Sequence, residues 1–250
     1  MLMYDNKIGN QIIKLNSVDS TNNYAAKLIK QTKVPFGTVI MARYQTNGKG
    51  QRNAVWDAEG ESNLLMSVVL NTQFLPVEKV FFLSKVVALA LNYSLDKFGI
   101  QSSIKWPNDL VVNQKKIAGV LIENQWIGQR LASSIIGIGL NVNQVIFPDS
   151  FNATSLKLLT SRSFIVEDVL KVICKYLNQF YNELIDLSFD KIDLTYHKLL
   201  VNHNRWARFR QKNEIFTAKV NGVNDEGELI LQLKNGQSKL YKLKEITQLL

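Results

Sequence analysis

One segment, Gly48-Lys49-Gly50-Gln51-Arg52-Asn53-Ala54-Val55-Trp56, lies between two stretches that both have the pattern of a β-strand, residues 38–44 and 63–70. A dinucleotide-binding turn leads from a strand into a helix, and Asn53 stands here where its third glycine would be. A P-loop is excluded as well, because no Gly-Lys-Ser/Thr closes the segment. The remaining interpretation is a cationic, glycine-containing loop that connects two strands. Such a loop can wrap an anion with its N–H groups and cations, although an ordinary surface turn would have the same pattern.

Helix-like and strand-like stretches follow one another in an order typical of an α+β protein. Capping residues at 19–22 precede a helical run at 23–30, and Pro76 opens a long helix that Gly99 closes. Further helices are expected at 167–187 and 191–201, and further strands at 103–106, 110–113, 116–123 and 131–143. The turn at 113–115 predicts a hairpin that carries Lys116 on its returning arm. We therefore expect a mixed, largely antiparallel sheet with helices.

The sequence changes in character near residue 204. Short β-like segments at 216–220, 229–233 and 239–243 are separated by turns rich in Asn, Asp and Gly. This pattern predicts a small antiparallel β-barrel. We expect two domains, residues 1–203 and 204–250.

Charge and composition limit the functions that can be expected of this chain. The net charge of +9 favours acidic partners, without saying which kind. The single cysteine, Cys174, lies in an apolar run and is expected to fill the core. With neither a signal-peptide pattern nor an apolar run long enough to cross a bilayer, we expect a cytoplasmic protein that does not enter membranes. The two histidines, His197 and His203, are not in a metal-ligand spacing, so a histidine-based zinc site is not expected.

Lys116 is the residue with the sharpest chemical interpretation. A partly desolvated lysine on a strand can neutralise a phosphate during phosphoryl or acyl transfer, whereas an edge-strand lysine that only reaches solvent is the alternative. Each other candidate also has a plain structural interpretation as a cap, turn former, bulge or core residue. These candidates are Ser20, Thr21, Asn22, Gln45, Trp56, Trp106, Asp109, Gly119 and Asn141.

Five segments together resemble the biotin protein ligase family in their order and approximate spacing. They are residues 19–22, 44–52 with Trp56, 105–110, 116–119 and 137–143. The resemblance extends over nearly the whole chain. It implies a biotin/lipoate ligase-like catalytic domain followed by a small SH3-like β-barrel.

The resemblance also implies a two-step reaction. Biotin carboxylate attacks the α-phosphate of ATP, with Mg²⁺ present, and gives biotinyl-5′-AMP and pyrophosphate. A lysine amine on a biotin carboxyl carrier domain of a carboxylase then attacks the mixed anhydride, and AMP leaves as the amide forms. A mobile loop that orders over the adenylate would protect it from water.

Residue roles follow from the same resemblance. Lys116 is the implied catalytic residue, which would hold carboxylate and phosphate oxygens. The implied biotin-binding residues are Ser20, Thr21, Asn22, Gln45, Gly48, Lys49, Gly50, Gln51 and Gly119, and the adenylate-binding residues are Lys49, Arg52, Trp56 and Asn141. The last group is structural or linked to the metal, without a firm metal ligand, and comprises Trp106, Asn108 and Asp109.

The chain departs from the family pattern in its loop. Relatives often have arginines where this chain has Lys49, Gln51 and Ala54, so fewer bidentate contacts with an anion are expected. We therefore expect weaker retention of biotinyl-AMP than in an arginine-rich relative. The first motif begins at Asp19, which leaves no room before it for the DNA-binding domain of some relatives, so direct DNA binding is not expected. Monomer and homodimer both stay open.

Two alternative functions remain at this level. A lipoate ligase or octanoyltransferase would share the fold, but the loop that ends in Trp56 and the segment 105–109 favour biotin. A nucleic-acid-binding protein could use a basic C-terminal barrel, although aromatic residues suited to base stacking are sparse there. The basic residues in question are Arg205, Arg208, Arg210, Lys239, Lys242 and Lys244.

Overall fold

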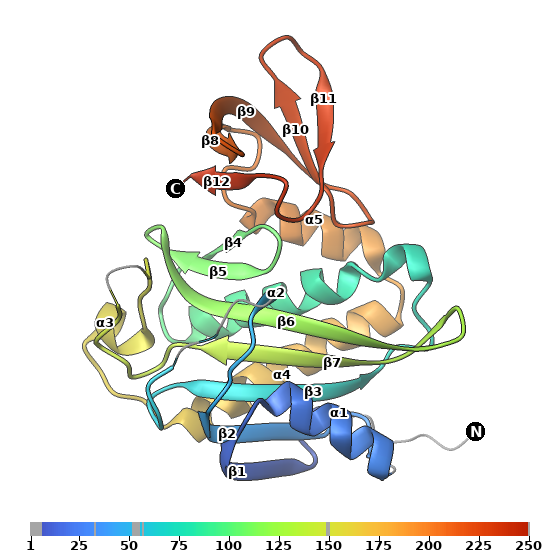
Figure 1. Ribbon diagram of the computed structural model, residues 1–250, viewed down its shortest axis with the longest axis vertical. Coiled ribbons are helices and arrows are strands. Elements are labelled where there is room, and N and C mark those ends of the chain that lie inside the picture. Colours follow the sequence, from blue (N-terminus) through green and yellow to red (C-terminus); the bar gives the residue numbers. More distant parts are fainter. Residues whose placement is uncertain (1–6, 33, 52–55, 57, 149–150, 250) are drawn as a thin grey trace.

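The computed structural model describes residues 7–32, 34–51, 56, 58–148 and 151–249. Its strands and helices belong to two sheets and the helices packed on them (Figure 1). The strands of the first sheet are β1 (Ile12–Val18), β2 (Val39–Gln45), β3 (Leu64–Asn71), β4 (Ser103–Lys105), β5 (Asp109–Val112), β6 (Lys115–Ile127) and β7 (Arg130–Leu140). The helices are α1 (Thr21–Gln31), the 3-10 helix η2 (Val77–Lys79), α2 (Phe82–Lys97), α3 (Leu156–Thr160), α4 (Val166–Ile185) and α5 (Phe189–Leu199). The second sheet contains β8 (Trp206–Gln211), β9 (Glu214–Val223), β10 (Leu229–Leu233), β11 (Ser238–Tyr241) and β12 (Thr247–Leu249).

The first sheet is mixed and largely antiparallel, as the sequence predicts. Its strand order is β1-β2-β3-β7-β6-β5-β4, and the β1–β2 pair is parallel while the other pairs are antiparallel. The predicted hairpin joins β5 to β6 through Asn113 and Gln114, whose φ angles of 48° and 66° are typical of a tight hairpin turn. This turn sets Lys116 at the start of β6, beside β5.

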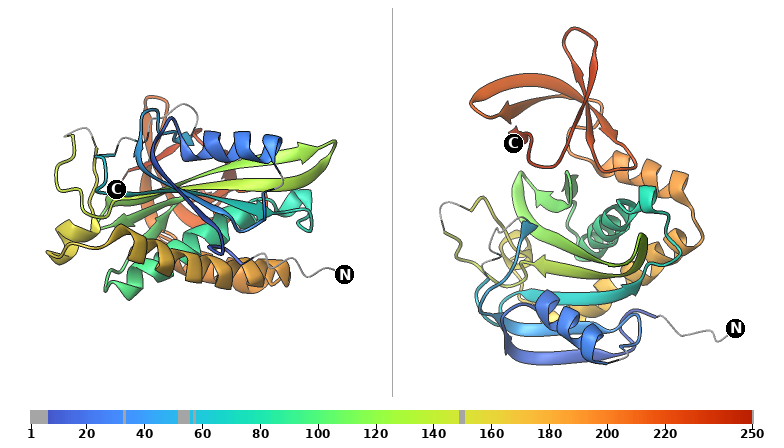
Figure 2. Two further views of the ribbon diagram at one scale, coloured as in Figure 1. Left: turned by 90° about the horizontal axis from the view of Figure 1, so that it is seen from below. Right: turned by 45° about the vertical axis from the view of Figure 1, so that its right-hand side comes forward.

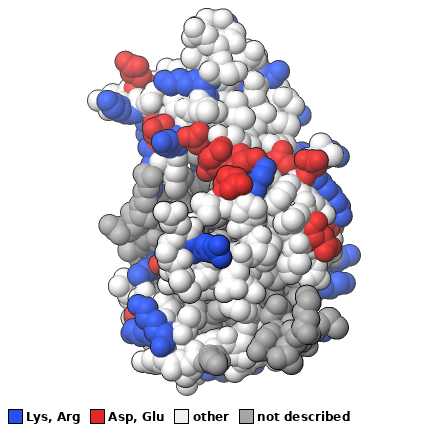
Figure 3. Space-filling view, turned by 90° about the vertical axis from the view of Figure 1, so that its right-hand side faces the viewer, with Lys and Arg blue, Asp and Glu red and all other residues white. Residues whose placement is uncertain are grey.

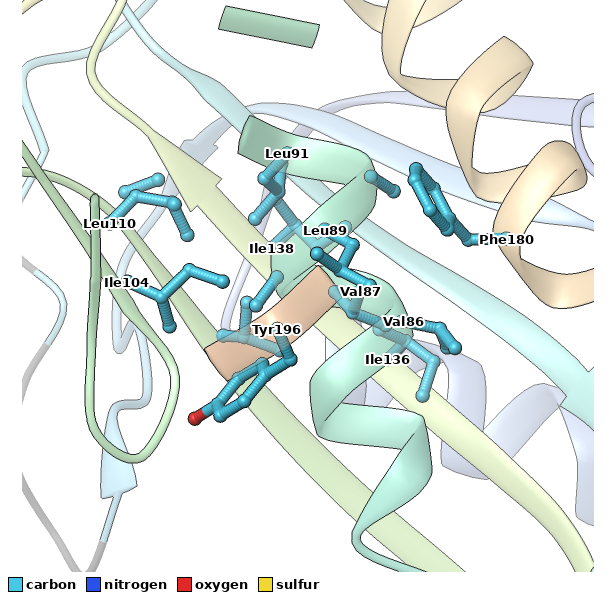
Figure 4. Packing of buried hydrophobic residues seen from close by; sticks show 14 of the residues in the cluster. Val86, Val87, Leu89, Leu91, Ile104, Leu110, Ile136, Ile138, Phe180 and Tyr196 are labelled. Carbon is cyan, nitrogen blue, oxygen red and sulfur yellow. The ribbon is translucent and has the colours of Figure 1, made fainter. Parts of the chain in front are cut away.

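Helices cover both faces of this sheet. Helix α1 lies on one face, and α2 and α4 pack together on the other (Figure 2). The core lies between α2 and the sheet, where Leu89 and Leu91 of α2 pack close to Ile136 and Ile138 of β7 (Figure 4). Burial of these apolar side chains stabilises the layer that carries the site residues described below.

The second sheet is antiparallel, in the order β11-β10-β9-β8-β12. It is docked on the part of the chain that contains the first sheet through specific polar contacts. Trp106 Nε1 donates to Gly227 O at 2.9 Å, Val223 N donates to His197 Nε2 at 2.9 Å, and Lys79 pairs with Asp225. The structure therefore establishes a second sheet after residue 204, whereas its finer description as an SH3-like barrel stays a prediction.

Several helices and strands of the structure were predicted only in part or not at all. The long helix expected from Pro76 begins as η2 and continues as α2 from Phe82. Strand β1, helix α3 and strands β8 and β12 were not predicted. Strands β1 and β12 pair with segments that are distant in sequence, and α3 has only five residues. Cys174 is buried, as expected, and burial raises the pKa of its thiol to about 11. None of the helices within the described residues is long and apolar enough to cross a membrane.

Candidate active site

A cavity of about 250 Å³ opens over the middle of the first sheet, between α1, the glycine-containing loop and the hairpin that begins β6. It brings together most of the residues that the sequence singled out. Those that line it are Ser20, Thr21, Asn22, Gln45, Lys49, Gly50, Gln51, Trp56, Asn108, Asp109, Lys116 and Gly119. Segments that are far apart in the sequence thus converge on one site.

Buried polar side chains form one end of the cavity. Ser20 is the N-cap residue of α1 by its backbone, yet its side chain makes no capping hydrogen bond. Gln45 Oε1 instead accepts from Thr21 N at 2.7 Å and lies 3.1 Å from Thr21 Oγ1. The cap cluster therefore faces the cavity and does more than begin a helix.

Lys116 and Asp109 form an ion pair in the cavity wall, with Lys116 Nζ 2.7 Å from Asp109 Oδ1. Lys105, which pairs with Asp109 across β4 and β5, adds a further cation nearby. Burial lowers the pKa of Lys105, the nearby Lys116 charge lowers it further, and the Asp109 carboxylate partly offsets both. Asp109 thus holds the Lys116 ammonium in the cavity wall, and Lys105, which does not line the cavity, adds positive charge nearby, which suits an anionic ligand.

Trp56 covers glycines of the sheet. A Cβ atom at Gly139 would lie 2.3 Å from Trp56 Cε2, and one at Gly119 would lie 2.9 Å from Trp56 Cζ3 and 3.1 Å from Lys116 Nζ. These positions accept only glycine because the indole ring and the lysine approach the backbone so closely. The Lys116 ammonium lies 5.5 Å from the Trp56 ring centroid, within the range of a cation–π contact.

The loop itself contributes cations and backbone to the cavity. Lys49 Nζ donates to Asn23 Oδ1 at 2.6 Å, and the exposed Lys49 side chain lies at the cavity edge. Gly48 lies beneath the loop, where Trp56 N donates to Gly48 O at 2.9 Å and an added Cβ would meet Trp56 O at 2.4 Å. Arg52, the remaining arginine of the loop, lies outside the described residues.

Two of the candidate residues, Asn141 and Trp106, lie outside the cavity lining. Asn141 is buried and does not line the cavity, because its Nδ2 donates to Thr154 O at 3.0 Å behind the sheet edge. Trp106 is also buried away from the cavity and joins the first sheet to the second through Gly227. Asn108 does line the cavity, and its amide donates to Val120 O.

Sequence reasoning missed three polar residues at this site. Ser67 and Glu123 hydrogen-bond to Asn22 behind the cavity floor, and Lys244 reaches the cavity from the turn before β12. Lys244 Nζ donates to Gln51 O at 3.3 Å, and its φ of 68° is unusual for a residue with a side chain. A signal existed only for Ser67, a lone hydroxyl in the apolar strand β3.

A Mg²⁺ ion would find few protein ligands here. Within the described part of the chain, no cluster of three or more His, Cys, Asp and Glu side chains could hold a metal. The cavity offers the Asp109 carboxylate, already paired with Lys116. This donor set fits a Mg²⁺ ion that is held mainly by phosphate oxygens and water, as is usual for nucleotide-bound magnesium.

The charged residues that line the described part of the cavity are Lys49, Lys116 and Lys244 against Asp109. A polar, buried end and a cationic end in one cavity suit a molecule with an uncharged ring and an anionic tail. The indole N–H of Trp56 is buried without a hydrogen-bond partner among the described residues, which leaves a donor that a bound oxygen could satisfy.

Comparisons with known proteins agree with this geometry. The model of the biotin/lipoate A/B protein ligase family matches residues 15–141. The bifunctional ligase/repressor BirA of Bacillus spizizenii is 33% identical over 239 residues, which cover 94% of this chain and 73% of the relative. The biotin–[acetyl-CoA-carboxylase] ligase of Paracoccus denitrificans is 27% identical over 239 residues, covering 87% of this chain and 92% of that protein. The solved structure of the Aquifex aeolicus biotin protein ligase, in complex with biotin and ATP, superposes with a TM-score of 0.80 at 26% identity and covers 96% of this chain and 98% of that one.

Proposed function

The chain belongs to the biotin/lipoate A/B protein ligase family, and we propose that it carries out both steps of biotin ligation in the cavity between α1, β6 and the glycine-containing loop. The protein is a biotin protein ligase of the biotin–[acetyl-CoA-carboxylase] ligase type. The observation that supports the residue assignment is the convergence of Thr21, Gln45 and Lys116 on one cavity.

The polar end of the cavity takes the ureido ring of biotin. Biotin is largely apolar apart from this ring and its carboxylate, so a cavity with a few polar anchors suits it. Ser20, Thr21 and Gln45 supply hydroxyl and amide groups at that end. The loop from Gly48 to Gln51 lies over the valeryl chain and keeps water from the reacting carboxylate.

The cationic end takes the carboxylate and the phosphates. Lys116 lies where it can neutralise the charge that develops as a carboxylate oxygen bonds to the α-phosphorus and pyrophosphate leaves. Lys49 and Lys244 lie at the cavity edge and attract the remaining phosphates, which partly replaces the arginines missing from the loop. A Mg²⁺ ion on the nucleotide would offset phosphate charge, with Asp109 as the nearby carboxylate.

The second step transfers biotin to a lysine of a carrier domain of a biotin-dependent carboxylase. The incoming amine attacks the carbonyl carbon of biotinyl-AMP, an N–C bond forms, the bond from that carbon to the phosphate oxygen breaks, and the amine loses a proton. Lys116 stabilises the departing AMP phosphate. We place this reaction in the cytoplasm, in line with the single, buried and unpaired cysteine.

The C-terminal module, residues 204–250, is proposed to be an SH3-like barrel that completes the cavity by presenting Lys244. Its contacts through Gly227, Val223 and Asp225 hold it in place relative to the hairpin that carries Lys116.

We propose that nucleic acid does not bind across the surface beside the site. A second cavity of about 370 Å³ adjoins the first at Gln51 and Asn108, and it is lined by the acidic residues Glu78, Asp225 and Glu226. Figure 3 shows acidic side chains gathered across the middle of this face, between the C-terminal module and the catalytic part. Phosphates of a nucleic acid would be repelled there.

The function is tested by mixing the protein with Mg²⁺, ATP, an apo carrier domain and either biotin or lipoate, and reading the acceptor mass. We expect the mass to increase by one biotinyl group with biotin and to stay unchanged with lipoate. An increase with lipoate alone would assign the protein to the lipoate branch of the family.

A further inference from the structure

A chain of close polar contacts runs beneath the polar end of the cavity, from Glu123 on β6 to Gln45 on β2. Asn22 Nδ2 donates to Glu123 Oε2 at 2.9 Å, and Asn22 Oδ1 lies 2.6 Å from Ser67 Oγ. Ser67 Oγ lies 2.7 Å from Thr21 Oγ1, which lies 3.1 Å from Gln45 Oε1. Thr21, Asn22 and Ser67 are 4%, 3% and 0% exposed, so each misplaced proton in this chain carries a free-energy cost.

Glu123 fixes the orientation of the Asn22 side chain. An ionised carboxylate accepts hydrogen bonds and has no proton to donate, so the amide must turn its NH₂ group toward Glu123. The Leu121 carbonyl, 3.4 Å from the same nitrogen, favours the same orientation. The Asn22 carbonyl then faces Ser67, and it lies so close to β7 that a Cβ at Gly137 would be 2.5 Å from Asn22 Oδ1.

The orientation of the Asn22 amide determines which acceptors receive the hydroxyl protons of Ser67 and Thr21. Ser67 has one hydroxyl proton, and the facing Asn22 carbonyl has none, so Ser67 donates to Asn22 Oδ1. The contact of 2.7 Å between Ser67 and Thr21 then takes the Thr21 proton, in preference to the longer contact of 3.1 Å between Thr21 Oγ1 and Gln45 Oε1. Gln45 Oε1 keeps its hydrogen bond from Thr21 N at 2.7 Å.

We propose that Glu123, acting through Asn22 and Ser67, is a positioning residue that makes Thr21 a hydrogen-bond acceptor toward the cavity. With its proton committed to Ser67, Thr21 Oγ1 offers only lone pairs to a ligand, and so the site selects ligands with N–H donors. This inference rests on the proposed function, because the ureido ring of biotin carries two N–H groups. Lipoate and octanoate carry no such group on their acyl chains, so the chain of hydrogen bonds sets the choice between the two branches of the family.

The test compares biotin with its cyclic carbonate analogue, in which an oxygen atom replaces each ureido N–H group at nearly the same size. Isothermal titration calorimetry measures both dissociation constants. The wild-type protein should bind the analogue at least about tenfold more weakly than biotin, because an oxygen lone pair would face the Thr21 lone pair. In Glu123→Gln the amide of Asn22 can turn over, the protons can reverse, and the ratio of the two dissociation constants should fall several-fold.

Ser67→Ala is a second variant that tests the same chain without touching Glu123. It removes the buried acceptor of the Thr21 proton, which Gln45 Oε1 at 3.1 Å and the ligand then share, and it should lower the same ratio. Glu61→Gln is the matched control, since it removes an exposed carboxylate paired with Arg43 and should keep the wild-type ratio. Thermal unfolding of each variant establishes that it is folded.

The outcomes separate this inference from the proposed function. Equal wild-type affinity for biotin and the carbonate analogue would overturn the acceptor role of Thr21 while leaving biotin binding intact. A wild-type ratio retained in both Glu123→Gln and Ser67→Ala would overturn the role of Glu123. Failure of the wild-type protein to bind biotin would overturn the proposed function, and this inference with it.

Discussion

Lys116 Nζ lies 2.7 Å from Asp109 Oδ1, and this pair links the returning arm of a hairpin to the strand before it. The carboxylate holds the ammonium group in place and also offsets its charge. The carboxylate of Asp109 therefore helps an anionic substrate by positioning Lys116 and hinders it by offsetting the positive charge. A substitution of Asp109 can separate these two effects.

Asp109→Asn is expected to lower kcat of adenylate formation about tenfold, because Lys116 loses the partner that positions it. The KM for ATP should not rise, since the substitution makes the cavity more positive by one charge. Pyrophosphate release at varied ATP concentrations measures both quantities, with Asp96→Asn, an exposed site on α2, as control. A raised KM with unchanged kcat would show that Asp109 binds the nucleotide instead.

Lys244→Gly should separate stability from function. Its φ of 68° suits glycine, so the free energy of unfolding should be maintained or rise. The lost cation should raise the KM for ATP about tenfold, the effect of one charge-assisted contact. Lys242→Ala, an exposed lysine of the same turn, is the control and should keep the wild-type KM. Wild-type kinetics in Lys244→Gly would exclude Lys244 from the site.

Asp193→Asn should destabilise the protein strongly. Lys85 Nζ is fully buried and lies 2.5 Å from Asp193 Oδ1, so the substitution would leave a buried ammonium without its counter-ion. We expect a loss of about 3–5 kcal/mol in the free energy of unfolding, measured by urea denaturation. Asp186→Asn, at an exposed site, should change it little. A loss below about 1 kcal/mol would contradict the role of Asp193 as the counter-ion of Lys85.

His203 should make stability depend on pH. Burial, reinforced by the nearby His197, lowers the pKa of His203 below the ordinary value of 6.5. Because the unfolded chain then binds the proton more readily, this contribution is fully present above pH 6.5 and declines as the pH falls below it. His203→Asn should flatten the decline in urea midpoints between about pH 7 and pH 5. An unchanged slope would assign the pH dependence to other groups.

The sequence predicts those parts of this site that depend on contacts within one turn or between elements that are adjacent in the sequence. The Lys116 hairpin was predicted correctly because Asn113 and Gln114 encode its turn locally. Thr21 and Gln45 meet because α1 and β2 are adjacent, which the order of elements suggests. Asn141 was expected at the site, but whether its amide faces a ligand or Thr154 depends on a loop that no local pattern specifies.

Contacts between distant segments account for the rest. Lys244 reaches Gln51 only because the second sheet docks through Trp106 and His197, and neither side chain signals that role in its own segment. Strand β1 was missed for a similar reason, since its pairing is parallel and at the edge of the sheet. The family resemblance, by contrast, was confirmed along with the biotin ligase function.

We propose that one cavity makes biotinyl-AMP and that Lys116 stabilises its formation. The decisive measurement is biotin-dependent pyrophosphate release from ATP by the wild-type protein, Lys116→Ala and Lys116→Arg. We expect wild-type release, a loss on the order of 10²–10³-fold in Lys116→Ala, and partial activity in Lys116→Arg, which keeps the charge but changes its shape. Release by Lys116→Ala at close to the wild-type rate would exclude Lys116 from adenylate formation.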